Sequence, residues 1–90
     1  MTAAFTLRHE LFRSKIAPIV YDSIVILYDK IKINKDGAAF KALYKLMIEI
    51  VMGYVSFQES CRNFERDVSD LPHKSDYMRE ILSMYGRFME

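Results

Sequence analysis

The sequence predicts an all-α protein, folded as one compact bundle of four or five short helices within a single domain, residues 1–90. Two observations lead to this fold class. Apolar side chains recur every three or four residues along five segments, which is the spacing of one helix face. Between these segments lie Pro, Gly, Asn and Ser residues, which are typical of turns and helix caps.

The first predicted helix runs from about Thr6 to Ile16, and its apolar residues follow helical spacing: Leu7, Leu11, Phe12 and Ile16. Thr6 suits the N-cap, because its hydroxyl can accept a hydrogen bond from a free backbone amide. Pro18 then breaks or restarts the helix, since it lacks a backbone N–H and restricts the residue before it. We therefore expect residues 1–17 to be peripheral and residues 18–90 to form the helical core.

The second predicted helix runs from about Pro18 to Ile33, with Pro18 in its first turn. The run Ile24-Val25-Ile26-Leu27-Tyr28 would also suit a strand, because β-branched and aromatic residues favour strands. A helix is favoured because Tyr21, Ile24, Tyr28 and Ile31 keep to one face, while another face carries Asp22, Asp29 and Lys32. The turn Asn34-Lys35-Asp36-Gly37 follows, and Gly37 is free to take positive φ there.

The third predicted helix runs from about Ala38 to Met52, and its charged residues form one narrow polar stripe. Lys41, Lys45 and Glu49 lie at i, i+4 and i+8. The rest of the circumference is apolar, with Phe40, Leu43, Tyr44, Leu46, Met47, Ile48, Ile50 and Val51. Such a helix is expected to be buried on several sides. Gly53 suits its end.

Two further amphipathic helices complete the predicted bundle. Ser56 and Glu59 have the spacing of a capping box before a helix over about Phe57–Val68, whose core face is Phe57, Cys61, Phe64 and Val68. Leu71-Pro72-His73-Lys74 is predicted to be a loop, and Ser75 the N-cap of a helix over about Asp76–Met89. The apolar residues of this last helix are Tyr77, Ile81, Met84, Tyr85 and Phe88.

Composition and charge narrow the classes of partner and compartment. Thirteen Lys and Arg against twelve Asp and Glu give a formal net charge of +1, so the sequence argues against nucleic acid as the partner. The single cysteine, Cys61, excludes an internal disulfide and fits a reducing compartment. The longest apolar stretch, Leu46–Val55, is interrupted by Glu49 and Gly53, so neither a membrane span nor a signal peptide is predicted. We expect an intracellular protein, cytoplasmic or nuclear.

The sequence contains no combination of residues that is typical of an active site. Cys61 lies on an apolar helix face, which favours a buried structural thiol over a nucleophile. His9 and His73 have no evident third ligand to complete a metal site with Asp76, and the three glycines do not form a phosphate-binding loop. We predict no catalytic residues, no cofactor and no metal, and therefore a protein that is not an enzyme.

Methionine and aromatic residues are abundant for so short a chain. The chain has six Met, six Phe and six Tyr, and 51% of its residues are hydrophobic. Met47, Met52, Met78, Met84 and Met89 could fill gaps in a small core or line a surface that accepts an apolar helix. Because a small domain covers little surface, we expect part of this apolar material to meet a partner.

The order of elements from Tyr21 to Phe88 is similar to that of small helical hub domains. The matching elements are helices around Ile24–Ile31 and Phe40–Val51, a shorter helix through Phe57–Val68, the loop Leu71–Lys74 and a last helix ending in Met84-Tyr85-Gly86-Arg87-Phe88. This layout resembles paired amphipathic helix domains of corepressor scaffolds and harmonin-homology domains. The resemblance implies a cleft that accepts an amphipathic helix, lined here by Ile24, Leu27, Tyr28, Leu43, Met47 and Val51. The helix Thr6–Ile16 is an addition to that layout and could itself occupy the cleft.

Two functions of different class follow from the surplus of apolar residues. The first is a protein–protein interaction module that binds an amphipathic helix or short linear motif of a partner through an apolar groove. The alternative is an obligate helical homodimer that serves as a structural or regulatory subunit, with the third helix packed on its own copy. The first would leave a monomer in solution, whereas the second requires a stable dimer.

Overall fold

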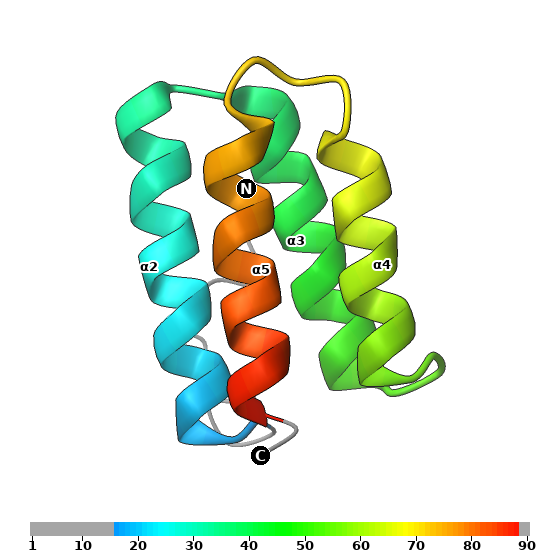
Figure 1. The fold of residues 1–90 in the computed structure, drawn as a ribbon. Coiled ribbons are helices and arrows are strands. Elements are labelled where there is room, and N and C mark those ends of the chain that lie inside the picture. Colours follow the sequence, from blue (N-terminus) through cyan, green and yellow to red (C-terminus); the bar gives the residue numbers. More distant parts are fainter. Residues whose placement is uncertain (1–15, 89–90) are drawn as a thin grey trace, which may run out of the picture.

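Four helices pack side by side in the computed structural model, which describes residues 16–88. They are α2 (Pro18–Asn34), α3 (Gly37–Met52), α4 (Phe57–Val68) and α5 (Lys74–Phe88). Successive helices run in opposite directions, and α5 returns to pack against α2 (Figure 1). The predicted all-α bundle is confirmed. The predicted first helix lies outside the described residues, apart from its last residue, Ile16, which forms a bend and is not helical.

Helix α2 begins at a proline and ends at a residue in the left-handed conformation. Pro18 lies in its first turn, and the carbonyl of Ala17 accepts hydrogen bonds from the N–H groups of Val20 and Tyr21. The helical prediction for this segment is therefore correct, and no part of it forms a strand. Lys35 ends the helix with φ 55, in the left-handed region.

The turn between α2 and α3 corrects the expectation for Gly37. Gly37 is the first residue of α3 and does not have positive φ. Asp36 is the N-cap, and its Oδ1 accepts a hydrogen bond from the Ala39 N–H at 3.2 Å. Because α3 starts directly after Asp36, the left-handed residue that reverses the chain has to precede it, and that residue is Lys35.

Helix α3 buries one face, not several as predicted. Its buried residues are Ala39, Ala42, Leu43, Leu46, Met47 and Glu49. Phe40 and Tyr44 are 43% and 40% exposed, although both are aromatic. The helix ends at Gly53, which has the predicted left-handed conformation with φ 71. The reason is the bundle geometry, because α3 has neighbours in α2 and α4 and nothing among the described residues covers its outer side.

The predicted polar stripe of α3 is divided between surface and interior. Glu49 is only 7% exposed, whereas Lys41 and Lys45 are exposed. The amide of Asn63 in α4 donates hydrogen bonds to both Glu49 carboxylate oxygens, at 3.3 and 3.5 Å. Arg66 in turn donates to the Asn63 carbonyl oxygen at 2.7 Å. Glu49 can be buried because these donors replace water at the α3–α4 contact.

Helices α4 and α5 complete the bundle with boundaries close to those predicted. The hydroxyl of Ser56 accepts a hydrogen bond from the Glu59 N–H at 3.0 Å, which is one of the two bonds of the predicted capping box. Helix α5 begins two residues earlier than predicted, at Lys74, so Ser75 lies inside it and is not its N-cap. The His73 carbonyl accepts from the Asp76 and Tyr77 N–H groups, which starts the helix before Ser75.

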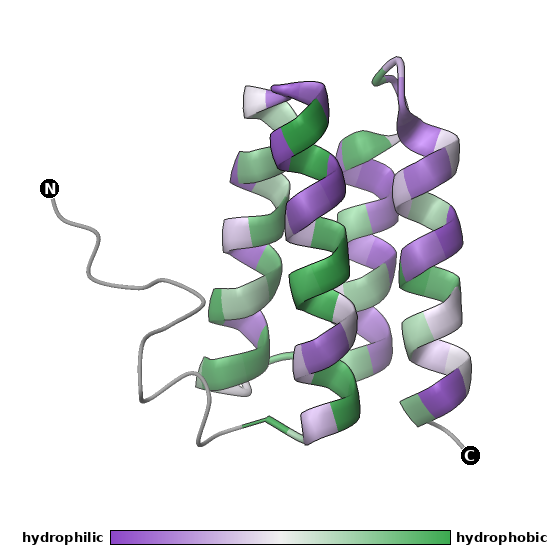
Figure 2. Ribbon diagram, turned by 90° about the vertical axis from the view of Figure 1, so that its left-hand side faces the viewer, coloured by the Kyte–Doolittle hydropathy of each residue, from purple (hydrophilic) through white to green (hydrophobic). Residues whose placement is uncertain are grey.

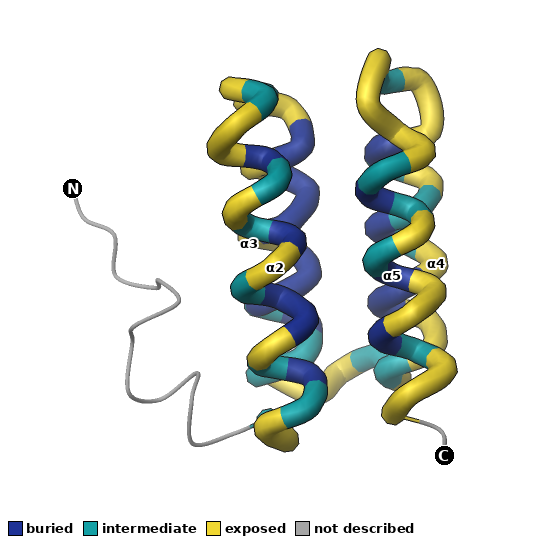
Figure 3. The backbone as a smooth tube through the Cα atoms, turned by 60° about the vertical axis from the view of Figure 1, so that its left-hand side comes forward, coloured by how far each residue is buried: buried dark blue, intermediate teal, exposed yellow. Residues whose placement is uncertain are grey.

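The core lies between the α2–α3 side and the α4–α5 side, where the buried residues of all four helices face inward (Figure 3). Tyr77 of α5 is fully buried, and its hydroxyl contacts the turn between α2 and α3. Its hydroxyl donates to Asp36 Oδ2 at 3.1 Å and accepts from Asn34 Nδ2 at 3.1 Å. The start of α5 is thereby fixed to the turn between α2 and α3.

Candidate protein-binding surface

The structure brings the six predicted groove residues to the contact between α2 and α3, but most of them belong to the core. Ile24 and Leu43 are 0% exposed, Leu27 is 1% and Met47 is 4% exposed. Tyr28 and Val51 are partly buried and pack against the core. A partner helix could therefore touch only these last two without opening the bundle.

An apolar surface continues outward from Tyr28 and Val51. We call it the outer stripe, and it consists of Val25 and Tyr28 of α2 with Phe40, Tyr44, Ile48 and Val51 of α3. The α3 residues lie at i, i+4, i+8 and i+11, so they share one face of that helix. Figure 2 views the bundle from the α2 side, and hydrophobic residues run along both α2 and α3 in that view.

Direct contact joins the two halves of the outer stripe. The rings of Tyr28 and Phe40 meet edge to face, with centroids 5.3 Å apart and an interplanar angle of 88°. This geometry is favourable for aromatic pairs and holds both rings in defined positions. Val25 and Ile48 are partly buried, yet neither packs against the core cluster. The apolar surface therefore extends beyond what the core itself requires.

Charged residues border the outer stripe differently on its two sides. On α2, Asp22, Asp29 and Lys32 are exposed, and they follow the spacing of one helix face. On α3, Lys41 and Lys45 are exposed, and the Lys45 ammonium lies 3.3 Å from an Asp67 carboxylate oxygen. The α2 border therefore carries two acidic residues against one basic residue, whereas the α3 border is basic, with part of its charge already paired within the bundle.

Further exposed apolar side chains lie apart from the outer stripe. At the α4–α5 contact the Phe57 ring packs against Tyr85 and Phe88, and Phe88 is 43% exposed. Ile33 at the end of α2 is 78% exposed, and Leu82 of α5 is 60% exposed. Met52 and Tyr54, at 64% and 68%, lie where α3 passes into the connection to α4. Single exposed apolar residues are common on protein surfaces, so these positions need no separate function.

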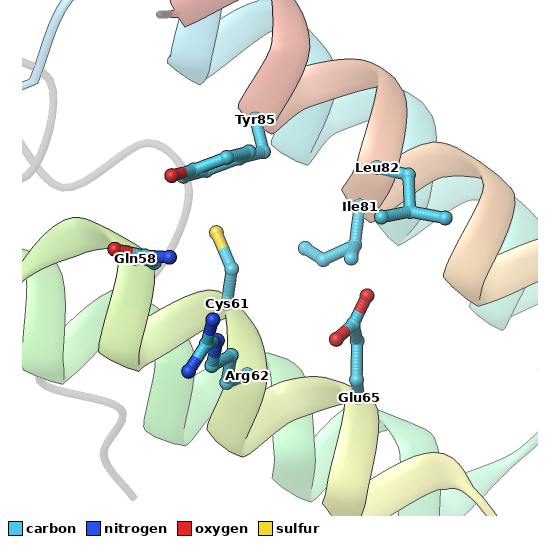
Figure 4. Close-up of a pocket in the computed structure, with 7 residues that line it drawn as sticks. All are labelled: Gln58, Cys61, Arg62, Glu65, Ile81, Leu82 and Tyr85. Carbon is cyan, nitrogen blue, oxygen red and sulfur yellow. The ribbon is translucent and has the colours of Figure 1, made fainter.

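A cavity of about 200 Å³ lies between α4 and α5, away from the outer stripe. Figure 4 shows its lining: Gln58, Cys61, Arg62, Glu65, Ile81, Leu82 and Tyr85. Cys61 is 4% exposed, which agrees with the predicted buried thiol. Burial, with a smaller effect of the nearby Glu65 carboxylate, raises the pKa of the Cys61 thiol to about 12. The thiol therefore stays protonated at neutral pH, which makes it a poor nucleophile.

The described residues offer no cluster for metal chemistry. Within residues 16–88, no three His, Cys, Asp or Glu side chains come together in a way that could hold a metal ion. His73 is exposed in the connection before α5, and His9 lies outside the described residues. None of the helices in that same part of the chain combines the length and hydrophobicity that crossing a lipid bilayer requires.

Comparisons with protein families, with curated proteins and with solved structures found no match for this chain. The proposed function therefore rests on the properties of the outer stripe. Sequence reasoning missed Phe40, Tyr44 and Ile48 as surface residues, because it took the third helix to be buried on several sides. A signal was present, since these three residues lie at i, i+4 and i+8 and form an apolar row that runs beside Lys41 and Lys45 on the helix surface.

Proposed function

We propose that this protein is a non-enzymatic interaction module that binds an amphipathic helix of a partner protein along the outer stripe. The observation that carries the proposal is the exposure of Phe40 and Tyr44 beside the partly buried Val25 and Ile48. Together these side chains form an apolar surface across two adjacent helices. Surfaces of this kind on small domains are typical sites of protein association.

The apolar spacing of the outer stripe and the charges around it predict the sequence pattern of the partner helix. Its apolar residues would recur at i, i+4 and i+7, matching the spacing of Tyr44, Ile48 and Val51. Asp22 and Asp29 outnumber Lys32 on the α2 border, and they favour a partner with Lys or Arg along the edge that faces α2. Because these border charges are exposed, they contribute more to the orientation and rate of binding than to its strength.

The expected affinity is moderate. Covering the exposed part of the Phe40 or Tyr44 ring is worth on the order of 1 kcal/mol per ring, because about two-fifths of each side chain is exposed. A helix that covers the whole stripe gains several times this amount, and the loss of rotational and translational freedom offsets part of it. We therefore expect a reversible contact and not a permanent complex.

Partner capture by three forms of the protein tests this proposal. The wild type is compared with Phe40→Asp, which places a charge in the outer stripe, and with Leu82→Asp, which adds the same charge on α5. Leu82 is 60% exposed, so both changes should leave the helical circular dichroism spectrum intact. Captured proteins are identified by mass spectrometry, and binding is then measured with purified peptides from their amphipathic helices.

The proposal expects at least one peptide that the wild type and Leu82→Asp bind alike and that Phe40→Asp binds at least about tenfold more weakly. If Leu82→Asp loses the peptide and Phe40→Asp retains it, the binding surface is the α4–α5 side and the proposal is wrong. The proposal is also wrong if neither charge affects binding of any captured helix.

A further inference from the structure

We infer that the outer stripe is also the docking site of the chain's own N-terminal segment, residues 1–15, which a partner helix has to displace. The displacement step rests on the proposed function, whereas the docking of the segment does not. The inference comes from four observations: the point where the segment joins the bundle, its length, its apolar residues and its charge.

The segment joins the bundle at one end of the outer stripe. Ile16 is partly buried and packs against the core, directly before the first turn of α2. Helices α2 and α3 run in opposite directions, so the beginning of α2 lies beside the end of α3, where Val51 is located (Figure 1). A segment leaving Ile16 therefore starts next to one end of the stripe.

The segment is long enough to cover the stripe. The predicted helix from Thr6 to the end of the segment would be about 15 Å long, at a rise of about 1.5 Å per residue, and the residues before Thr6 add up to about 3.3 Å each when extended. The stripe extends along α3 from Phe40 to Val51, which corresponds to about 17 Å by the same rise. The segment can therefore run back along the whole stripe after a single reversal of the chain.

The apolar residues of the segment provide a face that continues from Ile16. Phe12 and Ile16 lie at i and i+4, which is the spacing of one side of the predicted helix Thr6–Ile16. Ile16 is the described member of this face, and it packs against the core. Because Ile16 packs against the core, Phe12, four residues before it, is tethered within about 14 Å of that contact, which is close to this end of the stripe.

Charge favours the same placement. Arg8, Arg13 and Lys15 outnumber Glu10, so the segment has a formal charge of +2 with His9 neutral. On the α2 border of the stripe, Asp22 and Asp29 outnumber Lys32, and all three are exposed. Because the segment is covalently joined to the bundle, its effective concentration at the stripe is in the millimolar range. A separate copy of the protein reaches this value only when the total protein concentration is also millimolar.

A single tryptophan makes the docking measurable in the full chain, which contains no Trp of its own. Phe40→Trp places an indole in the outer stripe, and its emission maximum and quenching by acrylamide report how far it is shielded. Phe12→Asp is then added to this protein. Thr6→Asp is the matched control, because it adds the same charge to the segment and preserves the predicted N-cap.

The inference predicts that Phe12→Asp shifts the emission to longer wavelength and increases quenching, whereas Thr6→Asp changes neither. The difference in emission and quenching between the two variants should be the same at low and high protein concentration, since docking occurs within one molecule. If Phe12→Asp and Thr6→Asp give the same emission and quenching, the segment does not cover the stripe. A difference that disappears on dilution would mean that a second copy provides the cover, and would also overturn the inference.

Peptide binding separates this inference from the proposed function. If the segment competes with the partner, Phe12→Asp should strengthen binding of the captured helix, by up to the ratio of closed to open molecules. A spectral response to Phe12→Asp without any effect of Phe40→Asp on peptide binding would support docking and contradict the proposed function. Loss of binding in Phe40→Asp without a spectral response to Phe12→Asp would contradict docking and leave the proposed function in place.

Discussion

Replacing Leu43 with Asp should unfold the protein, and not merely weaken partner binding. Leu43 is 0% exposed, in the core beside α2. A carboxylate there would lose its hydration without gaining a partner, at a cost of several kcal/mol, in addition to the lost packing of the leucine. Because a small domain is stable by only about 5–15 kcal/mol, Leu43→Asp should remove the cooperative thermal transition in circular dichroism.

The control for this prediction is Phe40→Asp, three residues earlier in the same helix. Phe40 is 43% exposed, so its replacement loses the edge-to-face contact with Tyr28 but buries no charge. We expect a loss of about 1 kcal/mol in the free energy of unfolding, with the transition preserved. A folded Leu43→Asp protein with an unchanged melting temperature would show that Leu43 is accessible, and would restore the groove predicted from the sequence.

Replacing Tyr77 with Ala should lower the free energy of unfolding by about 3–5 kcal/mol, the usual range for a large aromatic side chain removed from a core. Tyr77 is 0% exposed, and its hydroxyl joins Asn34 to Asp36 at the turn between α2 and α3. The substitution therefore leaves a cavity and removes the link from α5 to that turn. Urea unfolding followed by circular dichroism measures the loss.

Tyr77→Phe separates the ring from the hydroxyl and has a specific pH dependence. It should cost about 1–2 kcal/mol, because Asn34 and Asp36 lose a hydrogen-bond partner while the ring stays packed. Burial, with the nearby Asp36 carboxylate, raises the pKa of the Tyr77 hydroxyl above its ordinary value of 10.0, although the bond from Asn34 acts in the opposite direction. The folded state therefore retains a proton that the unfolded chain releases.

Stability should consequently fall as pH rises above about 10, where the unfolded Tyr77 ionises first. Tyr77→Phe should show a smaller fall over this range. The Cys61 thiol lowers the stability of both proteins by a similar amount over this pH range, since its pKa is raised from 9.0 to about 12. If the wild type and Tyr77→Phe lose stability equally between pH 9 and pH 11, the Tyr77 hydroxyl does not titrate as the structure implies.

Most of the fold could be predicted from the sequence, because the signals that define it are local. The helix over Phe57–Val68 was predicted at its observed bounds, since Ser56 caps it and its apolar residues have a clean helical period. The helix from Pro18 was also predicted correctly against the strand alternative, and it runs one residue further, to Asn34. Gly53 ends α3 in the conformation that its missing side chain favours.

The errors arise from a contact with a neighbouring helix in one case and from the position of a helix cap in the other. Glu49 appeared to belong to a solvent-exposed stripe with Lys41 and Lys45, but it is buried because Asn63 on α4 supplies hydrogen bonds. The local pattern of α3 contains no information about that donor. The left-handed residue of the first turn is Lys35 and not Gly37, because the cap of α3 at Asp36 fixes where the chain reverses.

The candidate surface was only partly accessible to sequence reasoning. The six residues predicted to line a groove do lie where α2 meets α3, but the helices close on Ile24, Leu27, Leu43 and Met47 and leave Tyr28 and Val51 at the edge. Apolar periodicity identifies which residues avoid water, and it does not distinguish those that meet another helix of the same domain from those left outside. That distinction depends on how many neighbours each helix has.

Site-specific photo-crosslinking tests most directly whether the outer stripe is a binding surface. A photoreactive phenylalanine analogue replaces Phe40 in one protein and Leu82 in another, and both are irradiated in the source cells. We expect adducts from position 40 that map to an amphipathic helix of another protein, and none of these from position 82. An adduct from position 40 with a second copy of the chain would indicate a homodimer through the stripe. The absence of any adduct at position 40, with partner adducts at position 82, would contradict the binding surface described here.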